Sequence, residues 1–316
     1  MGVMSRIYVV SLPHRADRRV QMDQLERALG LNWTYVDAID ADDPLIANVM
    51  DQVRTLRNNV PTFSWPENID SQASSDALLE PAGSDIWTLS ALFGPLEPYF
   101  PGETPERFSP SARLQDPTRQ PSDPPPDLAC TADNDLLAPL APEHPAHMLL
   151  TPARIACWHS HLQVIRAIAN GNDDGPALVL EDDIDMEWDT QARLAALWSA
   201  LPAAWDIVYL GHCWSDETQL PALRRGPSAS LHPSAAPKCT HAYALSRRGA
   251  RRALLHLRHP PFAYSRAIDQ ALAWLVRSGR LRAFSVVPPV VVQRKDSSSD
   301  VMPGRGSEWR QGLDNG

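Results

Sequence analysis

Four carboxylates follow an apolar run in the second half of the chain. The run 177–180 (ALVL) leads into Glu181, Asp182 and Asp183, and Asp185 comes one residue later. Like charges this close repel each other, so a metal ion, a basic segment or solvent must balance them. Carboxylate oxygens suit Mg²⁺ or Mn²⁺, particularly where a diphosphate supplies further oxygens. The cluster therefore predicts either a metal site or an acidic turn that faces water.

A group of arginines follows the first apolar run of the chain. The stretch SLPHRADRR contains Arg15, Arg18 and Arg19 at the start of a predicted helix. Positive charge there opposes the helix dipole by about 0.3–1 kcal/mol for each exposed arginine. A bound phosphate would offset that cost, because arginine contacts phosphate through two hydrogen bonds. The alternatives are a phosphate site, at which Arg18→Ala weakens binding and leaves stability nearly unchanged, or a solvated basic helix face.

Other polar side chains allow both a chemical and a structural interpretation. His159 and His161 lie two residues apart on a predicted helix, which makes a poor chelating pair and favours a structural role. Asp269 opens a predicted helix, either as a capping or first-turn residue or as a carboxylate that faces a ligand. Gln293 ends the last predicted strand and residues 297–299 follow it, either as a polar terminus or as a cover over a ligand.

The hydrophobic patterns predict an α/β fold that would position these residues. Residues 6–12 read as a buried strand, 16–29 as a helix that ends before Gly30, and 32–39 as a second strand, which is the opening of a parallel sheet. The second half alternates helices at 152–170, 190–200, 247–257 and 266–279 with strands at 177–180, 205–211, 240–246 and 281–293. Ligands of open α/β sheets gather at the carboxyl ends of strands, so the acidic cluster should lie at that edge, with Glu181 and Asp183 on one face and Asp182 on the other.

The middle of the chain differs from both ends. Eleven of the thirty prolines lie between Pro101 and Pro145, and proline excludes long helices and inner strands. We predict one domain over 1–316, with 41–150 as a proline-rich, partly disordered insertion that holds one or two short helices.

Composition narrows the class of protein. The chain has 316 residues, 43% hydrophobic and 21% charged, and a net charge of -9, which disfavours a nucleic-acid partner. Its four cysteines form no CxxC pair, so a zinc ribbon is not indicated, and whether any of them pair stays open. No apolar run is long enough to span a bilayer, so we expect a cytoplasmic or membrane-peripheral location rather than secretion.

The order of the motifs is more specific than any one of them. In sequence come IYVVSLPHRADRR, VDAIDADD, ARIACWHSHLQVIRAI, ALVLEDDI, WDIVYLG, AYALSRRGARRAL, AIDQAL and QRKDSSSDV. This succession resembles glycosyltransferase family 25, the lipooligosaccharide and collagen galactosyltransferase-like group. The resemblance covers residues 5–40 and 152–302. It departs from the family at Ser11, where the family has asparagine, and in the long insertion.

The resemblance implies a GT-A fold, a Rossmann-like, mostly parallel central sheet with helices on both faces. It also implies transfer of a hexose such as galactose from a UDP-sugar to a hydroxyl of a glycan, glycoprotein or glycolipid, with inversion. The acidic cluster, Glu181, Asp183 and Asp185, resembles the family's metal motif for Mn²⁺ or Mg²⁺.

The same resemblance assigns roles to the remaining candidates. Ser11, Arg15 and Arg18 match the first motif on the nucleotide side, and Ser160 and His161 match a Ser-His pair. Inversion needs a base on the acceptor hydroxyl. We nominate Asp269 as that base, with Asp216 and His212 as rivals.

Two other functions compete with this interpretation. A phosphoacceptor receiver domain also has a strand that ends in acidic residues, but it needs an aspartate at the end of a later strand, where this chain has Gly211. A non-catalytic carbohydrate- or nucleotide-binding protein on the same fold is the second alternative.

Overall fold

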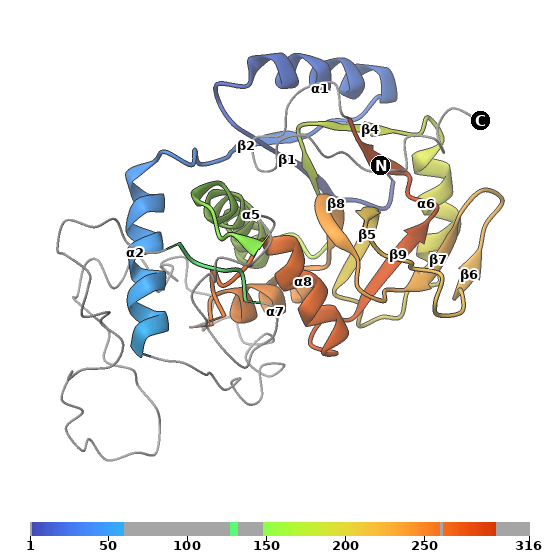
Figure 1. Ribbon diagram of the computed structural model, residues 1–316. Coiled ribbons are helices and arrows are strands. Elements are labelled where there is room, and N and C mark those ends of the chain that lie inside the picture. Colours follow the sequence, from blue (N-terminus) through green and yellow to red (C-terminus); the bar gives the residue numbers. More distant parts are fainter. Residues whose placement is uncertain (1, 60–126, 132–147, 260–261, 295–316) are drawn as a thin grey trace, which may run out of the picture.

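The computed structural model describes residues 2–59, 127–131, 148–259 and 262–294 (Figure 1). Its helices are α1 (Ala16–Leu29), α2 (Pro44–Asn59), α5 (Pro152–Asn170), α6 (Thr190–Trp198), α7 (Arg247–Leu257) and α8 (Ile268–Arg277). Its strands are β1 (Arg6–Ser11), β2 (Thr34–Asp37), β3 (Ala177–Glu181), β4 (Ile184–Met186), β5 (Ile207–Cys213), β6 (Arg224–Arg225), β7 (Ser230–Pro233), β8 (Lys238–Leu245), β9 (Ala283–Val287) and β10 (Val291–Gln293).

Eight of these strands form one mixed sheet, in the order β2-β1-β3-β8-β5-β9-β7-β6. The pairs β1–β2, β1–β3 and β5–β9 are parallel, and the other four pairs are antiparallel. Strands β8 and β7 are therefore reversed, while the other six strands of the sheet share one direction. The carboxyl ends of β1, β2, β3 and β5 consequently meet the amino end of β8 at one edge of the sheet.

Helices cover both faces of this sheet, which confirms the predicted α/β class (Figure 1). Successive strand residues alternate between two cores. Val9 packs into the core with α1 and α6, and Val10 packs into the core with α2, α5, α7 and α8. The predicted stripe of α5 is buried as expected, namely Ile155, Trp158, Leu162, Ile165 and Ala169.

Local signals set the helix ends where the sequence predicted them. Gly30 ends α1 with a φ of 60°, a left-handed conformation that glycine adopts without steric cost. Thr151 caps α5 by accepting a hydrogen bond from the backbone N–H of Arg154, and Pro152 follows in the first turn. Ser246 caps α7 in the same way through the N–H of Gly249.

The prediction of one continuous strand over residues 281–293 is wrong. Residues 281–293 form two strands, β9 in the main sheet and β10 in a separate two-stranded ribbon with β4. Pro288 and Pro289 separate them, and proline has no N–H to donate to a ladder. The ribbon brings Gln293 opposite Ile184, beside the acidic cluster.

Part of the proline-rich middle belongs to the core. Helix α2 buries Ile46, Val49 and Val53. Arg57 of α2 donates hydrogen bonds of 2.6 Å to the carbonyl of Ala129 and 2.9 Å to that of Ser265. Residues 60–126 and 132–147, which include the other predicted short helix and most of the prolines, lie outside the described residues. Among the described helices, none is long and apolar enough to cross a membrane.

Candidate functional site

The acidic cluster lies where three parallel strands end together. Strand β1 ends at Ser11, β2 at Asp37 and β3 at Glu181. A turn begins directly after Glu181, and the chain then returns as β4. The predicted position at the carboxyl edge of the sheet is therefore confirmed.

Arg18 supplies positive charge to the cluster. Its guanidinium Nη1 lies 2.9 Å from Oδ1 of Asp182 and 3.5 Å from Oδ2 of Asp183. The side chains of Arg18 and Asp182 are both only 8% exposed. The expectation of an exposed Arg18 is therefore wrong, because the helix start turns this side chain under the acidic turn. The negative charge of the carboxylates is therefore balanced in part by a basic side chain of the protein itself, Arg18.

Asp183 has one carboxylate oxygen that no described residue satisfies. Its Oδ1 is buried and has no hydrogen-bond partner among the described residues, whereas Oδ2 accepts a hydrogen bond of 3.0 Å from the amide of Gln293. Burial, followed by the negative charge of Glu181, raises the pKa of Asp183 to about 7. An unsatisfied buried oxygen beside a second carboxylate fits a divalent cation.

Glu181 is oriented by two neighbours. Its Oε1 lies 3.3 Å from Nε2 of His161 and accepts a hydrogen bond of 2.7 Å from the hydroxyl of Thr240. His161 is buried, and its Nδ1 lies 2.9 Å from the hydroxyl of Tyr243. Burial acts to raise the pKa of Glu181, but the contacts with His161 and Thr240 hold it below its ordinary value. Glu181 is therefore an ionised carboxylate whose Oε2 takes part in neither contact.

Asp185 has neighbours of its own on β4. It belongs to β4, opposite Val292, and its side chain is 50% exposed. Its Oδ1 accepts the N–H of Met186 and lies 4.0 Å from the guanidinium of Arg294. Across the described residues, no group of three or more His, Cys, Asp or Glu side chains is arranged to hold a metal ion. If Glu181 and Asp183 held an ion, several of its coordination positions would remain for substrate oxygens or water.

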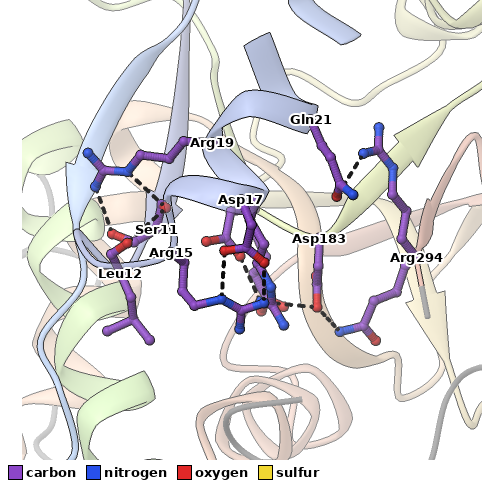
Figure 2. Close-up of polar contacts among 12 residues, drawn as sticks. Ser11, Leu12, Arg15, Asp17, Arg19, Gln21, Asp183 and Arg294 are labelled. Carbon is purple, nitrogen blue, oxygen red and sulfur yellow. Dashed lines mark hydrogen bonds and ion pairs between the residues drawn. The ribbon is translucent and has the colours of Figure 1, made fainter. Parts of the chain in front are cut away.

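The other arginines of the first motif contact protein oxygens (Figure 2). Arg15 makes two hydrogen bonds of 3.0 Å to Asp17 and lowers the pKa of that carboxyl to about 2. Arg19 turns back to the end of β1, where it contacts Ser11. It also contacts Asp37 at the end of β2. Ser11 thus accepts a hydrogen bond from the chain's own arginine.

A cleft of about 430 Å³ opens beside these strand ends. Its walls come from the β1–α1 loop, the segment after β2 and one face of α5, with the lining residues Pro13, His14, Asp37, Ala38, Ile39, Asp40, Asp43 and Gln163. The hydroxyl of Ser160 accepts a hydrogen bond of 3.0 Å from the N–H of Ile39, and the carbonyl of Ser11 accepts one of 2.9 Å from Ala38. Ser11 and Ser160 therefore shape the cleft by holding its backbone.

Asp269 lies in the first turn of α8, across the edge from the cleft. Its Oδ2 accepts a hydrogen bond of 3.3 Å from the backbone N–H of Cys239, at the start of β8. Burial raises the pKa of Asp269, and the negative charge of Glu181 adds to that increase. Asp269 is therefore close enough to Glu181 to sense its charge. A carboxyl with a raised pKa is better matched to general-base work near neutral pH.

The two rival bases are less suited to proton transfer. Asp216 accepts hydrogen bonds from the hydroxyl and the N–H of Thr218, which lower the pKa of its carboxyl. His212 is buried, and its Nε2 lies 3.2 Å from the carbonyl oxygen of Val286. Burial lowers the pKa of His212.

A disulfide between Cys213 and Cys239 joins the end of β5 to the start of β8 beside Asp269. The sequence left open whether any of the four cysteines pair, and these two lie 26 positions apart. Sequence reasoning also missed Thr240 and Tyr243. No motif marks these two, since they reach Glu181 and His161 only through the antiparallel pairing of β8 with β3.

The chain was compared with known proteins. No family model matches it, and no curated protein matches it significantly.

Proposed function

We propose that this chain is a metal-dependent glycosyltransferase of the family 25 type on a GT-A fold. It would transfer a hexose, with galactose the first candidate, from a UDP-sugar to a hydroxyl of a glycan-bearing acceptor with inversion. The observation that carries the proposal is a cleft at the ends of β1 and β2 beside the paired carboxylates at the end of β3. A volume of about 430 Å³ lies within the usual range for small-molecule sites.

Glu181 and Asp183 are the residues that would hold Mn²⁺ or Mg²⁺. The unsatisfied Oδ1 of Asp183 and the oriented carboxylate of Glu181 are oxygen ligands of the kind these ions prefer. When bound, the ion would act as a Lewis acid on the donor diphosphate. Arg18 would stay paired with Asp182 at 2.9 Å, and its guanidinium also lies 3.5 Å from Oδ2 of Asp183.

The nucleoside would occupy the cleft. Asp37 and Asp40 present carboxylates that can accept hydrogen bonds from ribose hydroxyls. Arg15 is better placed than Arg18 to exchange partners for a phosphate, because Asp17 is 60% exposed and an exposed ion pair contributes little stability. Asp269, with its raised pKa, would accept the proton of the acceptor hydroxyl.

Asp183→Asn tests the proposal directly. UDP titrations by calorimetry, with and without Mn²⁺, and hydrolysis of UDP-galactose and UDP-glucose would be measured on wild type and variant. We expect the variant to stay folded and to lose the Mn²⁺ dependence of UDP binding. Asp174→Asn is the matched control, since this aspartate is 87% exposed and precedes β3 at the opposite edge.

Unchanged Mn²⁺ dependence in Asp183→Asn would overturn the metal assignment. A wild type that binds UDP-sugars but neither hydrolyses nor transfers them would favour the non-catalytic alternative.

A further inference from the structure

Trp214 is the first residue after β5 and combines an exposed side chain with a strained backbone. Its side chain is 61% exposed. Its φ of 57° lies in the left-handed region, which bulky residues rarely adopt. A glycine would take this conformation without steric cost and without exposing an indole. Observed strain of this kind gathers at functional sites, so the residue invites a functional explanation.

Its neighbours place Trp214 beside the nominated base. The preceding residue, Cys213, forms the disulfide with Cys239, which also has a left-handed φ, of 67°. The N–H of Cys239 donates to Asp269 at 3.3 Å. Trp214 is thus linked, through Cys213 and the disulfide, to Cys239, whose N–H donates to Asp269.

The strand order then sets a sequence of sites along the edge of the sheet. The cleft lies at β2 and β1, the paired carboxylates at β3, Asp269 against β8, and Trp214 after β5. Trp214 is therefore separated from the nucleotide cleft by the carboxylates and by the base. A molecule that meets the donor at Asp269 from the opposite side would approach across Trp214.

We propose that Trp214 is a binding platform for a pyranose ring of the acceptor, an inference that rests on the proposed function. The exposed face of an indole packs against the C–H face of a sugar ring by hydrophobic and dispersion contact. This contact leaves the ring hydroxyls at the rim, and on the proposed function one of them would be the hydroxyl that gives its proton to Asp269. An acceptor whose reactive hydroxyl lies on a sugar is therefore the chemical class that this end of the site fits.

Saturation-transfer NMR with methyl β-D-galactopyranoside and methyl β-D-glucopyranoside tests the inference, in the presence of UDP and Mg²⁺. Wild type would be compared with Trp214→Gly and with Trp214→Phe, which keeps an aromatic face. Trp188→Ala is the matched control, because Trp188 is also exposed, at 77%. It lies between β4 and α6, after the carboxyl end of β4, whereas Asp183 precedes the amino end of that strand.

We expect wild type and Trp188→Ala to transfer saturation to at least one glycoside. Trp214→Gly should bind it about 10-fold more weakly, and Trp214→Phe should lie between. The melting temperature of Trp214→Gly should equal or exceed that of wild type, because the backbone strain is relieved.

Two results would overturn the inference while UDP still binds. One is equal saturation in Trp214→Gly and wild type, and the other is no saturation of either glycoside in wild type. A lower melting temperature with unchanged sugar binding would make Trp214 a structural residue and would also overturn it. If wild type does not bind UDP, the proposed function itself is refuted.

Discussion

The guanidinium of Arg18 and the carboxylates of Asp182 and Asp183 are a buried group of charges whose members depend on one another. Removal of the arginine would leave Asp182 almost fully buried without its ion pair. An uncompensated buried charge destabilises a protein by about 3–5 kcal/mol. This contact reverses the expectation that Arg18→Ala is neutral.

We therefore predict that Arg18→Ala lowers the free energy of unfolding by about 3 kcal/mol in urea titrations. Arg15→Ala is the comparison, because its partner Asp17 is 60% exposed and solvent screens the pair, so we expect a smaller loss of stability. Equal stability of the two variants would show that the Arg18 ion pair contributes no more than a surface pair.

His256 predicts a dependence of stability on pH. This side chain in α7 is fully buried, and burial, followed by the charge of Arg280, lowers its pKa to about 3. Below the ordinary histidine pKa of 6.5 the unfolded chain binds a proton that the folded chain does not. The contribution of His256 to stability is thus present above pH 6.5 and is lost as the pH falls toward 3.

Between pH 6.5 and 5 this residue should account for a loss of about 2 kcal/mol in the free energy of unfolding. We predict that His256→Gln, which cannot be protonated in this range, reduces the loss by that amount in urea titrations at the two pH values. His14→Gln is the comparison, since the side chain of His14 is 59% exposed. Parallel pH profiles for wild type and His256→Gln would contradict the prediction.

Helix α7 packs so closely against the start of β5 that there is no space for a side chain at Gly249. A Cβ at this position would come within 2.1 Å of the backbone oxygen of Asp206. Alanine favours a helix over glycine by about 1 kcal/mol, but here the helix would have to move away from the sheet.

We predict that Gly249→Ala destabilises the protein by at least about 2 kcal/mol, measured as a lower melting temperature. Gly30→Ala serves as comparison, since a Cβ there meets no atom within 4 Å and only the left-handed φ opposes it. That change should cost about 1 kcal/mol. A more stable Gly249→Ala variant would show that α7 can shift without loss of packing.

At the scale of the whole molecule, the disulfide links distant parts of the sequence at the edge that holds the site. We predict two free thiols per denatured chain without reductant, those of Cys130 and Cys157, and four after reduction. Cys213→Ser with Cys239→Ser should lower stability by about 2–4 kcal/mol. Four thiols before reduction, in protein purified under oxidising conditions, would show that the bond does not form. The thiol count also bears on location, because such bonds persist in oxidising compartments.

Local sequence patterns were enough to predict most of the elements and the edge of the sheet at which the carboxylates lie. Apolar periodicity predicted α1 and α5, and Gly30 and Thr151 set their ends, because these signals act over a few neighbouring residues. The position of Glu181 at the carboxyl end of β3 followed from the apolar run before it.

Which side chains meet at that edge depends on how the whole sheet is assembled. The contacts of Arg18 with Asp182, Thr240 with Glu181 and Gln293 with Asp183 join residues 164, 59 and 110 positions apart. They depend on strand order, on the reversal of β8 and on the break at Pro288 that sends β10 to β4. Local pattern carries none of this information, since pairing between distant strands is selected by the packing of the whole sheet.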